Sequence, residues 1–220
     1  MARSRRSHAW MQEHVSDPFV KRARKEGYRS RAAFKLLEIL QRDRLVKPGM
    51  LVVDLGAAPG GWAQVVAPML RPQGRLVALD VLPVQPIPGV AVVRGDFREE
   101  ATLRALEQAL GGRDVDLVLS DMAPNISGVS ASDQARSADL VELALDFALA
   151  HLKPGGSLLV KAFQGAGMDE LRDRMRQAFD SVSARKPKAS RDRSSEFYLL
   201  ARGLRARRSS GGPGPRFGLE

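Results

Sequence analysis

Charged side chains follow several short apolar segments of the chain. Asp80, Asp96 and Asp121 each lie at or just after the end of such a segment, and Lys161 directly follows another. Short apolar segments that alternate with helical patterns predict a mostly parallel sheet covered on both faces. Because ligands of open α/β folds bind at the carboxyl ends of the strands, we expect these four side chains along one rim of the sheet.

A glycine-rich turn joins the first predicted strand to a helix. Leu51–Leu55 is short and largely apolar, residues 56–61 form the turn, and a helical pattern begins at Trp62. This arrangement is typical of a nucleotide pocket. A dinucleotide fingerprint requires glycine at position 58, which is Ala58 here, and Pro59 lacks a backbone N–H that could hold a phosphate. The pattern therefore disfavours a pyrophosphate and favours an uncharged or cationic nucleoside, of which S-adenosylmethionine is the commonest.

Two of the carboxylates suit parts of such a nucleoside. Asp80 lies about twenty residues beyond the glycines, where an acidic residue can accept hydrogen bonds from ribose hydroxyls. Asp96 is expected to reach the adenine amino group. Lys161 is expected beside the cleft, where burial disfavours its charge. The alternatives are a turn-forming aspartate at position 80 and a structural lysine at position 161 whose amino group reaches solvent.

Length and composition predict one globular domain. The chain has 220 residues, 44% of them hydrophobic, and no cysteine. The lack of cysteine excludes disulfides and thiolate metal sites and favours a reducing cytoplasm, and three scattered histidines argue against any metal site. No apolar run approaches the ~20 residues of a membrane span, and residues 1–10 lack the apolar segment of a signal peptide. We therefore expect a cytoplasmic protein with no membrane partner.

The net charge of +10 is concentrated towards the two ends of the chain. Residues 1–31 hold nine Lys/Arg and three acidic residues, residues 184–208 hold nine and two, and residues 32–183 hold sixteen and nineteen. Basic segments that flank a nucleoside pocket favour nucleic acid as the partner. The alternative is that both basic segments are merely solvated tails.

Two helices are predicted before the first strand. Asp17 and Pro18 begin a helix that Gly27 ends. Ser30 is expected to cap a second helix over residues 31–44. On the wheel of that second helix Lys35 falls away from the apolar stripe, so periodicity alone predicts a solvated lysine.

The rest of the chain alternates between strands and helices. Lys153-Pro-Gly-Gly156 is expected to stop the helix over residues 133–151, and the tail from residue 209 is expected to be disordered because it is poor in apolar residues. Further strands are predicted at residues 75–80, 90–93, 115–120, 157–160, 180–185 and 196–201, and further helices at residues 99–110, 133–151 and 168–178.

Five motifs together resemble the FtsJ/RrmJ family of S-adenosylmethionine-dependent ribose 2′-O-methyltransferases. The resemblance covers about residues 10–202, and its motifs are residues 28–36, 54–62, 120–125, 158–165 and 195–198. It implies a Rossmann-like methyltransferase fold with a seven-stranded, mostly parallel sheet and helices on both faces. With the charge pattern, it suggests a basic, RNA-facing N-terminal extension and helix (1–29), a methyltransferase domain (30–204) and a disordered basic Gly/Pro tail (205–220).

The resemblance also implies which residues act. The family's catalytic Lys-Asp-Lys-Glu pattern falls on Lys35, Asp121, Lys161 and Glu196, which makes Lys35 a substrate-side group rather than a merely solvated one. Its cofactor contacts fall on Gly60, Trp62, Asp80, Asp96 and Asp121. Whether Lys161 acts as a neutral base or as a cation that orients the hydroxyl stays open, because its charged neighbours oppose one another.

Size and motif order resemble the bacterial family members that methylate a uridine in 23S ribosomal RNA of the large ribosomal subunit. We therefore expect S-adenosylmethionine as cofactor, ribosomal RNA or the large subunit as partner, and a monomer. The alternatives are a 2′-O-methyltransferase of transfer RNA or the messenger-RNA cap, and a noncatalytic RNA-binding ribosome-assembly factor. A nicotinamide-dependent oxidoreductase is disfavoured by Ala58 and Pro59.

Overall fold

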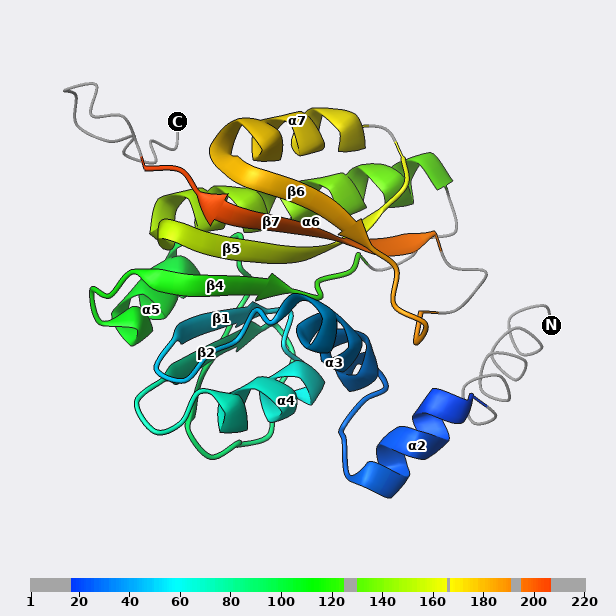
Figure 1. Ribbon diagram of the computed structural model, residues 1–220, viewed down its shortest axis with the longest axis vertical. Coiled ribbons are helices and arrows are strands. Elements are labelled where there is room, and N and C mark those ends of the chain that lie inside the picture. Colours follow the sequence, from blue (N-terminus) through cyan, green and yellow to red (C-terminus); the bar gives the residue numbers. More distant parts are fainter. Residues whose placement is uncertain (1–16, 125–129, 166, 191–194, 207–220) are drawn as a thin grey trace.

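One seven-stranded sheet forms the centre of the molecule. The computed structural model describes residues 17–124, 130–165, 167–190 and 195–206. The strands are β1 (Leu51–Leu55), β2 (Arg75–Asp80), β3 (Val90–Arg94), β4 (Val115–Ser120), β5 (Leu152–Phe163), β6 (Phe179–Arg185) and β7 (Glu196–Leu204). Their order in the sheet is β3-β2-β1-β4-β5-β7-β6 (Figure 1).

The sheet is parallel except for its last strand. β7 lies between β5 and β6 and runs antiparallel to both, whereas all other neighbours are parallel. The strand order reverses between β1 and β4: the connection after β1 leads to β2 on one side, and the connection after β4 leads to β5 on the other. Open α/β sheets bind ligands at such a switch point. The expected seven-stranded, mostly parallel fold is confirmed.

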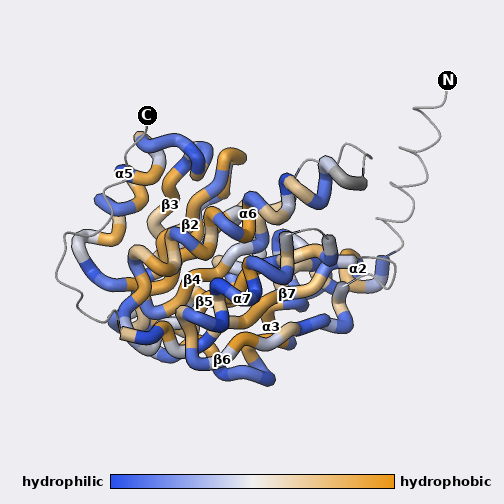
Figure 2. Tube along the Cα trace, turned by 90° about the horizontal axis from the view of Figure 1, so that it is seen from above, coloured by the Kyte–Doolittle hydropathy of each residue, from blue (hydrophilic) through white to orange (hydrophobic). Residues whose placement is uncertain are grey.

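Helices cover both faces of the sheet, as expected. α5, α6 and α7 supply buried side chains to one apolar core, and α3 and α4 supply them to the core on the opposite face. Figure 2 shows hydrophobic residues concentrated in the central strands β4 and β5. The helices are α2 (Pro18–Glu26), α3 (Ala32–Asp43), α4 (Gly61–Met69), α5 (Glu100–Leu110), α6 (Ser130–His151) and α7 (Met168–Ala178).

Helix α2 begins and ends as predicted. The Asp17 carboxylate accepts a hydrogen bond from the backbone N–H of Phe19 at 2.9 Å, and Gly27 closes the helix in the left-handed region at φ 76°. The helix packs through Ala23 against Phe34 of α3 and Ala189. The described part of the proposed N-terminal extension is therefore docked on the sheet-containing body.

Two local predictions are wrong. Ser30 does not cap α3: the N-cap position is Arg31, whose side chain does not cap the helix, and Ser30 packs against Gly61 instead. The strand predicted at residues 157–160 is longer than expected: β5 already begins at Leu152, which pairs with Val115 before a bulge, so residues 153–156 lie inside it.

The proposed domain boundaries stay predictions, and residues 1–16 and the tail from residue 207 lie outside the described residues. Within the described ranges, no helix is both long and apolar enough to cross a membrane.

Candidate active site

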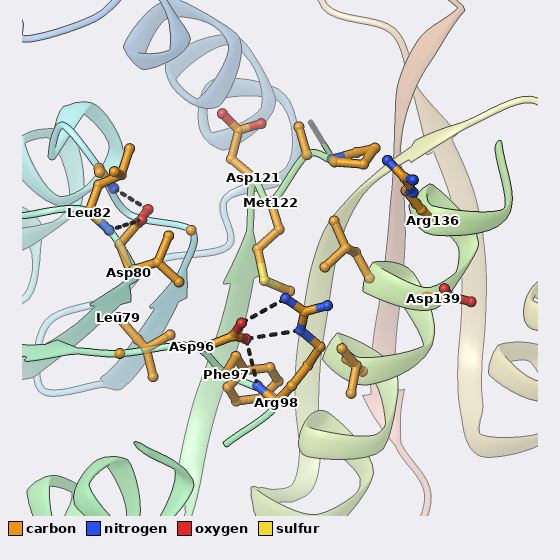
Figure 3. A pocket seen from close by; sticks show the side chains of 18 residues that line it. Leu79, Asp80, Leu82, Asp96, Phe97, Arg98, Asp121, Met122, Arg136 and Asp139 are labelled. Atoms are coloured by element: carbon orange, nitrogen blue, oxygen red, sulfur yellow. Dashed lines mark hydrogen bonds and ion pairs between the residues drawn. The ribbon is translucent and has the colours of Figure 1, made fainter. Parts of the chain in front are cut away.

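A cavity of about 570 Å³ opens at the carboxyl ends of β1, β2, β3 and β4. Its walls include Gly56 of the glycine loop and three of the predicted carboxylates, Asp80, Asp96 and Asp121. Figure 3 shows Asp80 and Asp96 on one side of the cavity and Arg136 and Asp139 of helix α6 on the other. The structure therefore brings the predicted carboxylates together at the switch point of the sheet.

Asp80 holds two loops of the cavity wall. Its Oδ2 accepts a hydrogen bond from the backbone N–H of Ala58 at 2.8 Å, and its Oδ1 accepts one from the N–H of Leu82 at 2.8 Å (Figure 3). The first bond fixes the glycine loop, and the second fixes the loop after β2. Each carboxylate oxygen has two lone pairs, so Asp80 retains capacity to accept ligand hydroxyls.

Asp96, which lines the cavity just after β3, is paired with Arg98. Its Oδ2 lies 2.7 Å from Arg98 Nη2, and its Oδ1 accepts from both the Nε and the backbone N–H of Arg98 at 3.0 Å. The side-chain and backbone hydrogen bonds from Arg98 lower the pKa of Asp96. This carboxylate is therefore ionised at neutral pH and can accept a hydrogen bond from an amino group.

Asp54, near the end of β1, is a buried carboxylate. It is 1% exposed, and neither carboxylate oxygen has a hydrogen-bond partner among the described residues. Burial, with the nearby negative charges of Asp121 and Asp80, raises its pKa to about 8. The negative charges of Asp121 and Asp80, which line the cavity, favour a cationic ligand over a phosphate. The sulfonium and ammonium groups of S-adenosylmethionine suit these carboxylate acceptors.

The glycine loop approaches its neighbours too closely for larger side chains. A Cβ at Gly56 would lie 2.7 Å from Met122 Cγ, and one at Gly60 would lie 2.7 Å from Arg29 Nη1. Both glycines also have positive φ, 77° and 106°. Glycine at these positions lets the loop pack tightly against the walls of the cavity.

Trp62 does not present its side chain to the cavity. The indole is 3% exposed, donates its Nε1–H to the carbonyl of Ala32 at 2.9 Å, and lies 5.7 Å from the ring of Tyr198. Gly60 and Trp62 are not among the residues that line the cavity. A cofactor contact of Trp62 would therefore have to come from its backbone at the start of α4.

Strand alternation brings the remaining predicted residues to the face covered by α3 and α4. Leu119 and Leu159 pack in that core, so Asp121 and Lys161, two residues further on, fall on the same face. Tyr198 of β7 pairs with Lys161 and packs in the same core, and Glu196 lies two residues before it. Lys161 lies within β5 rather than after it, because β5 continues to Phe163.

Lys161 is held by Asp121. Its Nζ donates to the backbone carbonyl of Asp121 at 2.5 Å and lies 3.2 Å from the Oδ1 of the same residue. The Tyr198 hydroxyl donates to this Oδ1 at 2.9 Å. Burial and the neighbouring carboxylates Asp121 and Glu196 raise the pKa of Tyr198 well above its usual value, so the phenol keeps its proton. Asp121 therefore joins the cavity to Lys161.

Lys35 forms the second lysine–carboxylate pair. Its Nζ lies 2.5 Å from Glu196 Oε1, which also accepts from the Ser190 hydroxyl at 3.1 Å. Burial alone would raise the pKa of Glu196, but the charges of Lys35 and Lys161 and these hydrogen bonds lower it. Lys35 is only 9% exposed. The solvated position that periodicity alone predicts for Lys35 is therefore wrong.

Sequence reasoning missed two members of the site. Tyr198 could have been found, because it follows Glu196 by two residues on a predicted strand and so shares its face. Ser190 has no such signal, since it lies in an irregular loop and reaches Glu196 only in the folded chain. The two pairs place two ammonium groups and two carboxylates beside the cavity, which suits the positioning and deprotonation of a hydroxyl.

Comparison with known proteins assigns the family. The FtsJ-like methyltransferase model matches residues 28–204. The chain is 61% identical over 207 residues to the ribosomal RNA large subunit methyltransferase E of Methylobacillus flagellatus, covering 94% of this chain and 99% of that protein. It is 58% identical over 205 residues to the protein of the same name from Chromobacterium violaceum, covering 93% and 100%.

A solved structure shares the fold. The chain superposes on a crystal structure from Plasmodium falciparum with a TM-score of 0.73 and 27% sequence identity, over 82% of this chain and 100% of that chain. The sheet order, the pocket suited to a cationic nucleoside and the family match agree with the expectation from the motifs. The chain belongs to the FtsJ-like family of S-adenosylmethionine-dependent methyltransferases.

Proposed function

We propose that the protein methylates the 2′-oxygen of a uridine ribose in 23S ribosomal RNA of the large ribosomal subunit. The observation that carries this proposal is the meeting of the Lys35–Glu196 and Lys161–Asp121 pairs beside the cofactor cavity. The 61% identity to a ribosomal RNA large subunit methyltransferase E over almost the whole of both chains supports the substrate.

Lys161 is the group we assign to the 2′-oxygen. When bound, S-adenosylmethionine supplies an electrophilic methyl group. The Lys161 nitrogen has four tetrahedral positions. Its own carbon takes one, and the contacts with the backbone carbonyl oxygen and the Oδ1 of Asp121 account for two more. The fourth position meets the substrate, either as a lone pair that accepts the hydroxyl proton or as an N–H that orients the oxygen. Asp121 thus fixes the direction in which Lys161 acts.

Lys35 and Glu196 are assigned to holding the ribose beside Lys161. Both side chains are 11% exposed, and Lys35 Nζ lies 5.9 Å from the centroid of the Tyr198 ring. Asp80 is assigned to the cofactor ribose and Asp96 to the adenine amino group, because both line the cavity and retain acceptor capacity. Gly60 and Trp62 are assigned backbone contacts to the cofactor.

An exposed basic surface supports RNA as the partner. Helix α2 exposes four cations, and the loop after β6 exposes two more. The two segments lie together, because Arg31 donates to the carbonyl of Ala189 and Ala23 packs with Ala189. Such a surface binds phosphates without reading sequence, so its affinity for RNA should fall steeply with salt. The six exposed cations are Lys21, Arg22, Arg24, Lys25, Lys186 and Lys188.

We also infer a monomer that acts in the cytoplasm. Large apolar side chains that are exposed in the described ranges are few, namely Met69, Val81, Leu82 and Val92, and two of these line the cavity. The described part of the chain therefore offers no large apolar patch for a stable subunit interface. Light scattering after gel filtration should give the mass of one chain, 24.0 kDa; a dimer mass would overturn the inference.

The decisive experiment maps 2′-O-methyl groups after incubation with labelled S-adenosylmethionine. Unmodified large subunits, free 23S ribosomal RNA and transfer RNA are offered separately. Label at one uridine 2′-oxygen of the large-subunit RNA is expected with the wild-type protein and not with Lys161→Ala. Label confined to transfer RNA, or on a base rather than a ribose, would overturn the proposal.

A further inference from the structure

Arg29 makes an unusual set of contacts behind the cofactor cavity. Its guanidinium donates to three backbone carbonyls: from Nη1 to Pro59 at 3.2 Å and Gln85 at 2.7 Å, and from Nη2 to Pro86 at 2.9 Å. All three acceptors are uncharged, and they come from two different loops. A guanidinium has several N–H donors that point in fixed directions, so it can reach carbonyls of two loops at once, whereas a lysine ammonium is a single compact centre.

The two loops that Arg29 joins are the loops that Asp80 holds from the cavity side. We call residues 56–60 and 81–87 the cofactor wall. Asp80 bonds Ala58 in the first loop and Leu82 in the second, and both residues line the cavity. Arg29 also packs against Gly60, since a Cβ there would lie 2.7 Å from its Nη1. The wall is thus fixed by a carboxylate on one side and a guanidinium on the other.

The sequence of the second loop explains why it needs an outside donor. Residues 82–89 read Leu-Pro-Val-Gln-Pro-Ile-Pro-Gly, and three prolines leave few backbone N–H groups to hold the loop together. Arg29 itself is held firmly: its backbone N–H donates to Gln64 Oε1 at 2.8 Å, and Gln64 Nε2 donates to the carbonyl of Gly27 at 3.2 Å. Arg29 is therefore fixed to helix α4 through Gln64.

The geometry points to Arg29 as a positioning residue that sets the affinity for the cofactor by holding the cofactor wall in its binding conformation. It acts through Ala58, Asp80 and Leu82 rather than on the reacting atoms. The inference deepens the proposed function, but it concerns binding of the cofactor alone and does not depend on which RNA is methylated.

The test is calorimetric titration of S-adenosylmethionine into the full-length protein without RNA. Arg29→Ala is expected to raise the dissociation constant about tenfold or more, because it removes charge-assisted hydrogen bonds. Arg29→Lys should recover part of this loss. The matched control is Arg104→Ala, which removes an exposed arginine of α5 that pairs only with Glu100 among the described residues; its affinity should equal that of the wild type.

Steady-state kinetics separates positioning from chemistry. For Arg29→Ala we expect the KM for S-adenosylmethionine to rise by the same factor, with kcat at saturating cofactor within about threefold of wild type. A wild-type dissociation constant in Arg29→Ala, or a large loss of kcat with unchanged KM, would overturn the inference. If Arg29→Ala does not fold, as judged by circular dichroism, Arg29→Lys decides: it should bind S-adenosylmethionine more weakly than the wild type, and an unchanged dissociation constant would overturn the inference. A protein that shows the expected shift in affinity but methylates no ribosomal RNA would refute the proposed function and not this inference.

Discussion

The two halves of the site are built in different ways. In the cofactor half, around β1, β2 and β3, the partners of Asp80 and Asp96 lie near them in the sequence. Asp80 accepts from Leu82, two residues on, and from Ala58, 22 residues before it, and Asp96 accepts from Arg98, two residues on. In the substrate half, around β4, β5 and β7, two lysines are held by carboxylates across buried long-range pairs. The first half presents a preformed set of acceptors, whereas the second presents charged groups whose positions depend on each other.

This difference predicts that damage to the substrate half lowers turnover, while damage to the cofactor half lowers affinity for S-adenosylmethionine. Asp121 is the point of contact, because it lines the cavity and also holds Lys161. Variants on either side of Asp121 can therefore separate the two halves.

The largest effect is expected for Lys161→Ala. Loss of the group that meets the 2′-oxygen should lower kcat by about 10²- to 10⁴-fold, while the affinity for cofactor is retained. The measurement is single-turnover methylation together with calorimetric titration of S-adenosylmethionine. Lys153→Ala is the matched control, since Lys153 lies on the same strand but pairs with Asp116 at the opposite end. Substantial turnover in Lys161→Ala would refute its assigned role.

Asp80→Ala should act on the cofactor half. Removing a carboxylate that fixes both loops of the wall is expected to raise the KM for S-adenosylmethionine about ten- to a hundredfold, with a much smaller change in kcat. The exposed Asp173 of α7, which pairs with Arg176, gives the control variant Asp173→Ala. A fall in kcat at unchanged KM would show that the two halves are not separable in this way.

A smaller effect is expected for Tyr198→Phe. The change keeps the ring that packs on Trp62 but removes the hydroxyl that donates to Asp121 Oδ1. Because one hydrogen bond to a charged group is lost, kcat should fall about threefold to tenfold. Tyr28→Phe, at the only other tyrosine of the chain, is the control. An unchanged rate would mean that Lys161 suffices to hold Asp121 without the Tyr198 hydroxyl.

The last prediction concerns stability rather than turnover. The pKa of Asp54 is raised to about 8, so the folded protein binds more protons than the unfolded chain between about pH 4 and pH 8. The stabilisation is fully present below the unfolded pKa and is lost as the pH rises through 8. Glu196 and Asp43 have lowered pKa values, so their contributions are lost instead as the pH falls.

Asp54→Asn should therefore remove a downward slope of the unfolding free energy between pH 4 and pH 8. Urea denaturation of the cofactor-free protein at pH 5, 7 and 9 measures this slope, with the wild type alongside. Equal slopes in the two proteins would show that the buried carboxylate does not titrate in this range.

Most of the cofactor half could be predicted from the sequence. Its signals are local: a strand, a glycine turn and a carboxylate about twenty residues on. Topology alone then brings Asp80, Asp96 and Asp121 to one rim, and the cavity contains all three. What the pattern does not reveal is that Trp62 turns its indole into the core, because an aromatic side chain at a helix start is compatible with either position.

The substrate half was harder to predict because its partners are distant in sequence. Lys35 and Glu196 are 161 residues apart. A helical wheel considers only one helix, so it predicts a solvated lysine even where a distant strand supplies a carboxylate. The same holds for Asp43 of α3, whose carboxylate forms two hydrogen bonds of 2.6 and 2.7 Å with Arg185 of β6. Lys35, Ile39 and Asp43 form one buried stripe of α3, which apolar periodicity alone cannot identify.

The position of β7 has a consequence for synthesis of the protein on the ribosome. Because β7 inserts between β5 and β6, β6 has no strand beside it until β7 has been made (Figure 1). A nascent chain ending before residue 196 already contains every carboxylate of the cofactor cavity, but it lacks Glu196 and Tyr198. The carboxylates of the cofactor cavity are therefore synthesised before the last residues of the substrate half, and insertion of one late strand completes that half and both apolar cores.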